Sequence, residues 1–423
     1  MIDYASTATK KIGTIVFGLI SATLVARYLG PNGRGDYAVI VGFSSILFSI
    51  LNFGVSNYYA RERRDIGSSI AYSYGLYFLL IFVIIFSCGL LWNLSSDGNN
   101  LYAMGTILAS FSLLRMQTQS VLLVEDLRGA TRAAILGAAS ESSFILICYL
   151  FFDKYVVLAV CALVTKELII FVASWRRLRL YPGERRKIWP IGANLVGGRN
   201  VKEIAFAFVL SALITINYKI DAVIMSALDI PAYKIGIYAV GVAIAEYLWI
   251  LSDIFKDVQV SRTARGSDSQ GVVRSVRMAI VLTLAAYLSF IAVGWVVVPF
   301  VFGPEFLESY LVTLWMLGAT IFMVPCKIIG VYYISIGRFE PYVKTMVAAV
   351  FVNVTLNFIL IPFLGIYGAV VASIVSYFLA GMCIMVDFGK MSSIKLGEIM
   401  VLRKEDVDRI HSSIVRRLNR ERE

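Results

Sequence analysis

The chain has little of what most enzymes and metal proteins need: one histidine, His411, and five cysteines among 423 residues. A single histidine excludes clustered histidine ligands and most Ser–His or Cys–His catalytic schemes. No Gly-x-x-x-x-Gly-Lys-Ser/Thr phosphate-binding loop occurs, which excludes that route to ATP. The cysteines lie in apolar stretches without the spacing of a metal or redox pair, so we expect neither a metal nor a cofactor. They are Cys88, Cys148, Cys161, Cys326 and Cys383.

Charge is also scarce, at 16% of residues, whereas 59% are hydrophobic. The apolar residues fall into twelve stretches, each long enough for the ~20 residues that a membrane-spanning helix needs. The sequence therefore predicts an all-α integral membrane protein with 12 transmembrane helices. The stretches are 10–29, 36–59, 68–94, 101–123, 133–152, 155–175, 201–226, 236–256, 278–302, 308–334, 345–364 and 366–388.

Basic residues are distributed unequally between the two sides of this predicted membrane protein. Of 39 Lys and Arg residues, 31 are assigned to one side, including those at the ends of stretches on that side. Five more lie within the stretches, and only Arg34, Lys154 and Lys234 fall on the other side. The positive-inside rule places both termini in the cytoplasm. The net charge of +11 is explained by basic residues on the inner side, which contact anionic lipid headgroups. We therefore expect no nucleic-acid partner. No cleavable signal peptide is expected, because the first apolar segment is a full span.

The loops on the outer side are too short for a catalytic domain, since the longest, 228–235, has eight residues. A carrier or pore is therefore favoured over an enzyme. The basic connection after residue 175 divides the chain into two similar halves. Gly35–Val39 recurs as Gly236–Val240, and Leu136–Phe152 resembles Val347–Phe363. Corresponding spans run in the same direction, which indicates a parallel internal repeat. The expected domains are a first six-helix bundle at 1–175, a cytoplasmic linker at 176–200, a second bundle at 201–388, and an amphipathic or disordered tail at 389–423.

Two motifs carry a family resemblance. One is Ala-Arg-Tyr-Leu-Gly-Pro-Asn-Gly-Arg-Gly-Asp-Tyr-Ala at 26–38, and the other is the Asn-rich segment 353–362 with Gly-Ile-Tyr-Gly-Ala at 365–369. With Tyr218–Asp221, they resemble Wzx-type polysaccharide flippases of the multidrug/oligosaccharidyl-lipid/polysaccharide exporter (MOP) superfamily. The resemblance implies a V-shaped pair of six-helix bundles in the bacterial inner membrane. It also implies an undecaprenyl-pyrophosphate-linked oligosaccharide as substrate, surface polysaccharide such as O-antigen as product, and a polysaccharide polymerase as partner.

Charged residues within the apolar stretches are the candidate site, because a charge in hydrocarbon costs ~3 kcal/mol or more unless it is compensated. We expect Arg115, Lys219 and Lys327 to line a cavity and to bind the pyrophosphate or acidic sugars. The alternative is that these cations pair with carboxylates between helices. Arg27, at the outer end of the first stretch, is a further binding candidate, with snorkelling to the interface as its alternative.

Transport without ATP requires an ion gradient, for which a desolvated carboxylate is the expected proton or sodium carrier. Asp221 and Glu246 are the first candidates and Glu141 is the third, whereas a purely structural pairing is the alternative for Asp221. Two other functions stay open: a drug or metabolite cation antiporter of the same superfamily, and a membrane scaffold for glycan-assembly enzymes.

Overall fold

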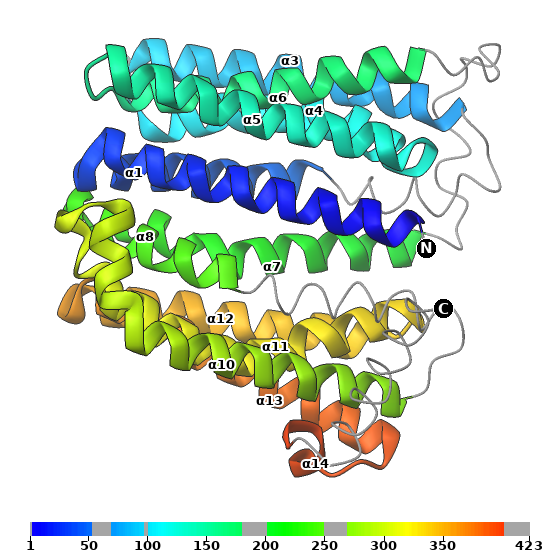
Figure 1. Cartoon of the computed structure of the whole chain (residues 1–423). Coiled ribbons are helices and arrows are strands. Elements are labelled where there is room, and N and C mark those ends of the chain that lie inside the picture. The colour runs from blue at the N-terminus through cyan, green and yellow to red at the C-terminus, as the bar shows by residue number, and fades with distance from the viewer. Residues whose placement is uncertain (1, 53–68, 97–99, 180–200, 249–268, 402–423) are drawn as a thin grey trace, which may run out of the picture.

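The computed structural model describes residues 2–52, 69–96, 100–179, 201–248 and 269–401, and these residues form a stack of long α-helices (Figure 1). All twelve predicted apolar stretches overlap a described helix. The helices are α1 (Ile2–Leu51), α3 (Ser69–Ser95), α4 (Leu101–Glu125), α5 (Leu127–Phe151), α6 (Val156–Arg179), α7 (Val201–Ala227), α8 (Ala232–Leu248), α10 (Ser269–Phe302), the 3-10 turn η1 (Pro304–Phe306), α11 (Ser309–Ser335), α12 (Phe339–Leu364), α13 (Ile366–Ser392) and α14 (Leu396–Met400).

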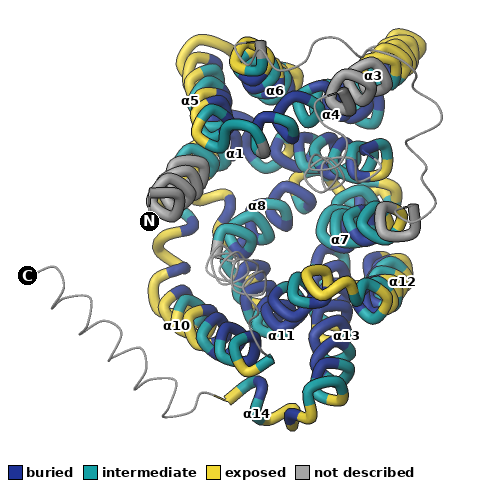
Figure 2. The backbone as a smooth tube through the Cα atoms, turned by 90° about the vertical axis from the view of Figure 1, so that its right-hand side faces the viewer, coloured by how far each residue is buried: buried dark blue, intermediate teal, exposed yellow. Residues whose placement is uncertain are grey.

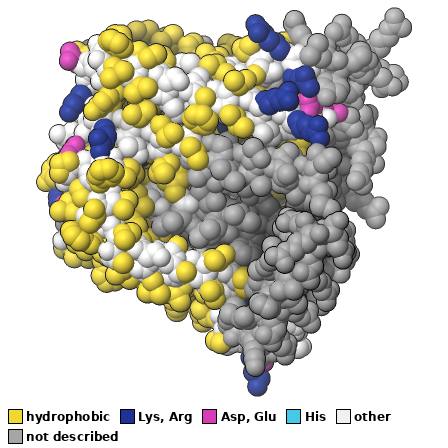
Figure 3. Space-filling model, in the orientation of Figure 1, with side chains coloured by type: hydrophobic (Ala, Val, Ile, Leu, Met, Phe, Trp, Pro, Cys, Tyr) yellow, Lys and Arg dark blue, Asp and Glu magenta, His cyan; other side chains and the backbone are white. Residues whose placement is uncertain are grey.

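The prediction of a helical membrane protein is confirmed. Within the described residues, eight helices are long and apolar enough to cross a membrane. Large apolar side chains cover their outer surface, and Phe300 and Phe363 are 78% and 83% exposed. An apolar surface of this extent is typical of a protein that contacts lipid. Figure 3 shows hydrophobic side chains between two ends at which charged side chains gather.

Helix α1 contains the first two predicted stretches and bends between them. Gly30 has φ of 65° and ψ of −177°, a conformation that favours glycine, and Pro31 follows it inside the helix. Proline cannot donate the next backbone hydrogen bond and clashes with the preceding turn, which explains the bend at this place. Gly30 therefore separates two helical parts of α1, which correspond to the first two predicted stretches.

Helix α1 lies between two groups of helices, α3–α6 on one side and α7–α13 on the other (Figures 1 and 2). It packs against α4 and α5 in the first group and against α7 and α8 in the second. Within the groups, α5 packs on α6, α3 on α4, α12 on α13, and α11 on α13. Most direct contact between the groups thus passes through α1.

Two glycine-containing turns meet where α1 approaches α8, and we call this contact the glycine seam. A Cβ atom on Gly35 would lie 1.8 Å from the carbonyl oxygen of Ala232, and one on Gly236 would lie 2.0 Å from that of Pro31. Both distances are far below van der Waals contact, so only glycine permits this approach. Gly35 and Gly236 are 201 residues apart, as are Pro31 and Ala232. The sequence repeat is therefore also a reciprocal structural contact.

The predicted linker and tail are only partly described. The linker continues α6 to Arg179, and 180–200 lie outside the described residues. Helix α13 continues to Ser392, beyond the expected end of the second bundle at 388, and α14 follows it. Ile399 of α14 is fully buried and Arg277 of α10 donates to the carbonyl of Glu398, so this part of the tail packs against the helices. The amphipathic segment predicted beyond residue 401 lies outside the described residues.

Candidate functional site

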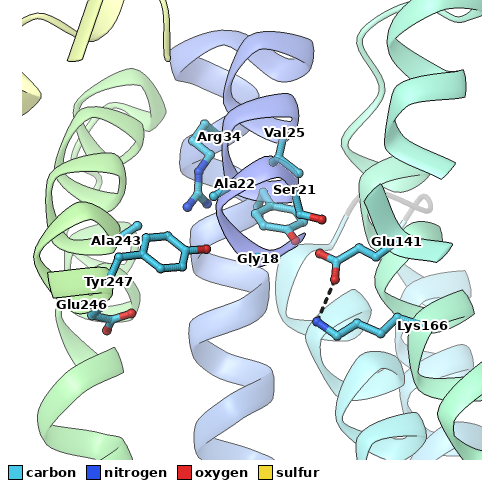
Figure 4. A pocket seen from close by; sticks show the side chains of 11 residues that line it. Gly18, Ser21, Ala22, Val25, Arg34, Glu141, Lys166, Ala243, Glu246 and Tyr247 are labelled. Carbon is cyan, nitrogen blue, oxygen red and sulfur yellow. Dashed lines mark hydrogen bonds and ion pairs between the residues drawn. The ribbon is translucent and has the colours of Figure 1, made fainter. Parts of the chain in front are cut away.

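A cavity of about 420 Å³ lies between the bend of α1 and helices α5, α6 and α8 (Figure 4). It joins residues from both halves of the chain, with α1 supplying the largest share of its wall. Its volume lies within the range of small-ligand sites in proteins. The lining residues are Gly18, Ser21, Ala22, Val25, Arg34, Tyr37, Glu141, Lys166, Ala243, Glu246 and Tyr247.

Both glutamates of the cavity are paired with lysines. Lys166 Nζ lies 2.7 Å from Glu141 Oε2, an interaction visible in Figure 4. Lys219 Nζ, on α7, lies 2.7 and 2.9 Å from the two carboxylate oxygens of Glu246. Pairing of this kind offsets much of the cost of removing each charge from water. The two glutamates therefore carry little uncompensated charge.

Arg34 has a different environment. Its side chain is only 9% exposed, and its Nε atom is buried without a hydrogen-bond partner. Its guanidinium carbon lies 5.2 Å from the ring centroid of Tyr37, within the range of a cation–π contact. Sequence analysis assigned Arg34 to an outer loop. The residue follows the break at Gly30, and it is buried in the protein rather than exposed in a loop.

A second polar centre surrounds Asp221 on α7, which is 4% exposed. Its carboxylate accepts hydrogen bonds from Tyr238 Oη at 2.5 Å, Asn357 Nδ2 at 2.8 Å and Ser373 Oγ at 2.8 Å. These donors come from α8, α12 and α13, and all three are neutral. Among the described residues, no basic side chain forms an ion pair with Asp221. A buried carboxylate of this kind can be stabilised by a proton or by a small cation.

Oxygen atoms around Asp221 would suit such a cation. Asn353 lies beside Asn357. The Nδ2 atom of Asn357 donates a hydrogen bond to the Oδ1 atom of Asn353 at 3.1 Å. The Oδ1 atom of Asn357 is buried without a hydrogen-bond partner. Carboxylate, amide and hydroxyl oxygens are ligands for hard cations. The described residues hold no group of three or more His, Cys, Asp or Glu arranged for a metal ion, so a multi-carboxylate site is absent from them.

The structure places the other predicted binding residues apart from one another and outside the wall of the cavity. Arg115 donates to Glu167 and Gln119 within the first half. Lys327 lies 6.0 Å from the ring centroid of Tyr218. Arg27 is exposed and donates to the carbonyls of Phe300 and Val301, at the end of α10. Arg115 pairs with Glu167, and Lys219 pairs with Glu246. These contacts match the alternative that the cations pair with carboxylates between helices.

Of the predicted residues, only Glu141 and Glu246 line the cavity directly, and Lys219 joins them through Glu246. Sequence reasoning missed Arg34, Tyr37 and Tyr247 as site residues. A signal for two of them was present, since Gly33-Arg34-Gly35-Asp36-Tyr37 lies within the motif that carried the family resemblance. Tyr247 has no comparable signal, because one more aromatic residue in an apolar stretch is ordinary.

Comparison with known proteins defines the class to which this architecture corresponds. No protein-family model matches the chain, and no curated protein matches it in sequence. Solved structures match over nearly the full length and show that the chain has the fold of MOP-superfamily transporters and flippases. At identities of 11–14%, this likeness concerns the fold.

Three structures illustrate the likeness. An inward-facing multidrug resistance MATE family transporter has a TM-score of 0.68 and 14% identity, with 90% of this chain and 94% of that chain covered. The lipid II flippase MurJ, inward closed, has a TM-score of 0.64 and 11% identity over 93% and 88% of the two chains. An outward-facing MATE family transporter has a TM-score of 0.59 and 13% identity over 91% and 93%.

The Glu141–Lys166 pair allows a direct test of charge compensation at the cavity wall. Glu141→Gln leaves Lys166 without its carboxylate, and we expect a loss of about 2 kcal/mol of unfolding free energy, below the full buried-pair value because Lys166 is 31% exposed. Adding Lys166→Met should recover at least half of the loss. Thermal unfolding in detergent gives the double-mutant cycle. Additive losses from the two substitutions would show that the pair contributes nothing.

Proposed function

We propose that the chain is a flippase for undecaprenyl-pyrophosphate-linked oligosaccharides in the bacterial cytoplasmic membrane. It moves these units from the inner to the outer leaflet for surface polysaccharide synthesis. Twelve membrane spans form two six-helix bundles, with both termini in the cytoplasm and the linker 176–200 between the bundles. The chain breaks no covalent bond, and its cargo is passed to a polymerase and other assembly proteins.

The observation that carries this proposal is the cavity lined by residues of both halves, with the glycine seam next to its residue Arg34. Alternating access requires such a cavity and a contact that can separate. This chain is more similar to the inward-facing MATE family structure, with a TM-score of 0.68, than to the outward-facing one, with a TM-score of 0.59. This difference supports an outer position for the seam. It agrees with the charge distribution that predicts cytoplasmic termini.

The size of the cavity limits which part of the cargo it encloses. A volume of about 420 Å³ has room for a polar headgroup rather than for a whole lipid-linked oligosaccharide. The remaining sugars extend toward the open end, and the prenyl chain stays in the lipid. The likeness to a lipid II flippase supports a lipid-linked cargo of this kind.

Asp221 is the proposed site of ion coupling, with either a proton or sodium as the ion. Its partner Tyr238 lies two residues after Gly236 of the seam, so occupancy of the carboxylate acts on the first turns of α8. Ser309 Oγ on α11 donates to the carbonyl of Ile237 at 2.7 Å and holds the same turn. Binding of a cation at Asp221 would therefore change the strength of the contact that closes the cavity.

A cation antiporter is the second candidate, because Glu141 and Glu246 line the cavity and two MATE family transporters share the fold. Acidic walls suit cationic drugs when the carboxylates are free. Here a lysine lies 2.7 Å from each glutamate, which favours the flippase.

Deletion of the gene is the primary test of the proposed function. We expect lipid-linked repeat units to accumulate on the cytoplasmic face and surface polysaccharide to disappear, because no other step carries the units across. Mass spectrometry of lipid extracts and protection from an externally added glycosidase measure both effects. Normal surface polysaccharide together with increased sensitivity to cationic dyes would instead establish the antiporter.

The coupling role of Asp221 is tested with Asp221→Asn in proteoliposomes. The substitution keeps the shape of the side chain and removes its charge. We expect the stimulation of flipping by an imposed proton or sodium gradient to fall about tenfold, whereas exchange without a gradient continues. Glu305→Gln, at an exposed carboxylate in η1, is the matched control. Equal gradient stimulation in the Asp221→Asn chain and the wild-type chain would exclude Asp221 as the coupling residue.

A further inference from the structure

We propose that Arg34 is the anion-recognition residue of the central cavity and that it binds a phosphoryl or carboxylate group of the transported molecule. This inference rests on the proposed function in one respect, that the cavity is the transport cavity. It assigns substrate recognition to a residue outside the four basic candidates that the sequence suggested. Those four are Arg27, Arg115, Lys219 and Lys327.

Charge compensation in the cavity points to Arg34. Glu141 is paired with Lys166 and Glu246 with Lys219, at 2.7 Å in each case. Among the described lining residues, Arg34 is then the cation that remains without a carboxylate. Its Nε–H group is buried and has no hydrogen-bond partner. Leaving a buried charged donor unsatisfied is costly, so this site is incomplete until an acceptor enters it.

The surroundings of Arg34 suit an oxyanion. A guanidinium presents a planar set of donors that matches two oxygens of a phosphate or a carboxylate. In Figure 4, Arg34 lies near Tyr247, and Glu141 and Lys166 lie on the other side of the cavity. Tyr37 contacts the guanidinium through its ring face at 5.2 Å, which holds the group without using its N–H donors. The buried Nε–H donor is thus left for the ligand.

The position of Arg34 also links recognition to the seam. It lies between Gly33 and Gly35, and Gly35 is the residue that meets Ala232. An anion bound by Arg34 therefore lies next to the contact that must separate. Binding of the anion and separation of the seam would therefore involve the same turn of α1.

A thiol-reactivity experiment tests the anion preference without any assumption about the cargo. Ala243, on the α8 wall of the cavity, is replaced by cysteine in a full-length chain whose five native cysteines are alanine. Reaction rates with the sulfonatoethyl and trimethylammonioethyl methanethiosulfonates are compared in detergent. We expect Arg34→Gln to lower the anionic-to-cationic rate ratio about fivefold.

Two variants accompany Arg34→Gln. Arg34→Lys keeps the charge and should largely keep the ratio, which shows that the cavity remains folded around residue 34. Arg132→Gln removes one charge from an exposed position that does not line the cavity, and the ratio should not change. A ratio that is the same in the Arg34→Gln and parent chains overturns the inference.

Binding measurements by native mass spectrometry then distinguish the sources of the anion. The probes are undecaprenyl pyrophosphate, the neutral undecaprenol, and a free oligosaccharide containing glucuronate. A loss of about tenfold in affinity on Arg34→Gln, confined to one anionic probe, assigns Arg34 to the phosphoryl or the carboxylate group. The rate ratio could fall while undecaprenyl pyrophosphate binds no better than undecaprenol. That combination would support anion recognition by Arg34 and contradict the proposed cargo.

Discussion

The close approach of two backbones at Gly35 and Gly236 is the constraint on which the rest of the site depends. It requires glycine on both sides, because any Cβ would overlap a carbonyl oxygen of the opposite turn. It also requires the kink at Gly30, which turns the second half of α1 toward α8. Arg34 of the cavity lies next to Gly35 of the seam. Tyr238, which donates to Asp221, follows Gly236 by two residues.

Charge compensation is the second principle of the structure. Most of the described intramembrane ions have a partner of opposite sign on another helix, as Arg115 has in Glu167 and Lys219 has in Glu246. Such pairs support packing and contribute little net charge to a ligand. Two buried centres depart from this rule, because Arg34 and Asp221 lack an ion-pair partner among the described residues. A transported anion and a coupling cation would supply the missing charges, and both centres act on the seam.

Sequence reasoning predicted the helices well, because bilayer thickness fixes the length of an apolar span and leaves a direct signal. It also found the Gly35 and Gly236 repeat, which became a physical contact. It did not predict the rotation of each helix about its axis, and that rotation decides whether a charge faces a cavity or a neighbouring helix. Arg115 and Glu167 could therefore not be recognised as a pair. Arg34 was expected on the outer side, and the sequence did not show that it would be buried next to the break in α1.

Hydrogen–deuterium exchange of the seam tests the central claim most directly. Gly236→Ala would place a Cβ atom 2.0 Å from the carbonyl oxygen of Pro31, whereas the control Gly397→Ala meets no atom within 4 Å. The account predicts that peptides covering 30–37 and 231–238 exchange faster in Gly236→Ala than in the wild-type chain, and that Gly397→Ala leaves them unchanged. Unchanged exchange at both segments in Gly236→Ala would contradict the claim that this glycine contact closes the cavity.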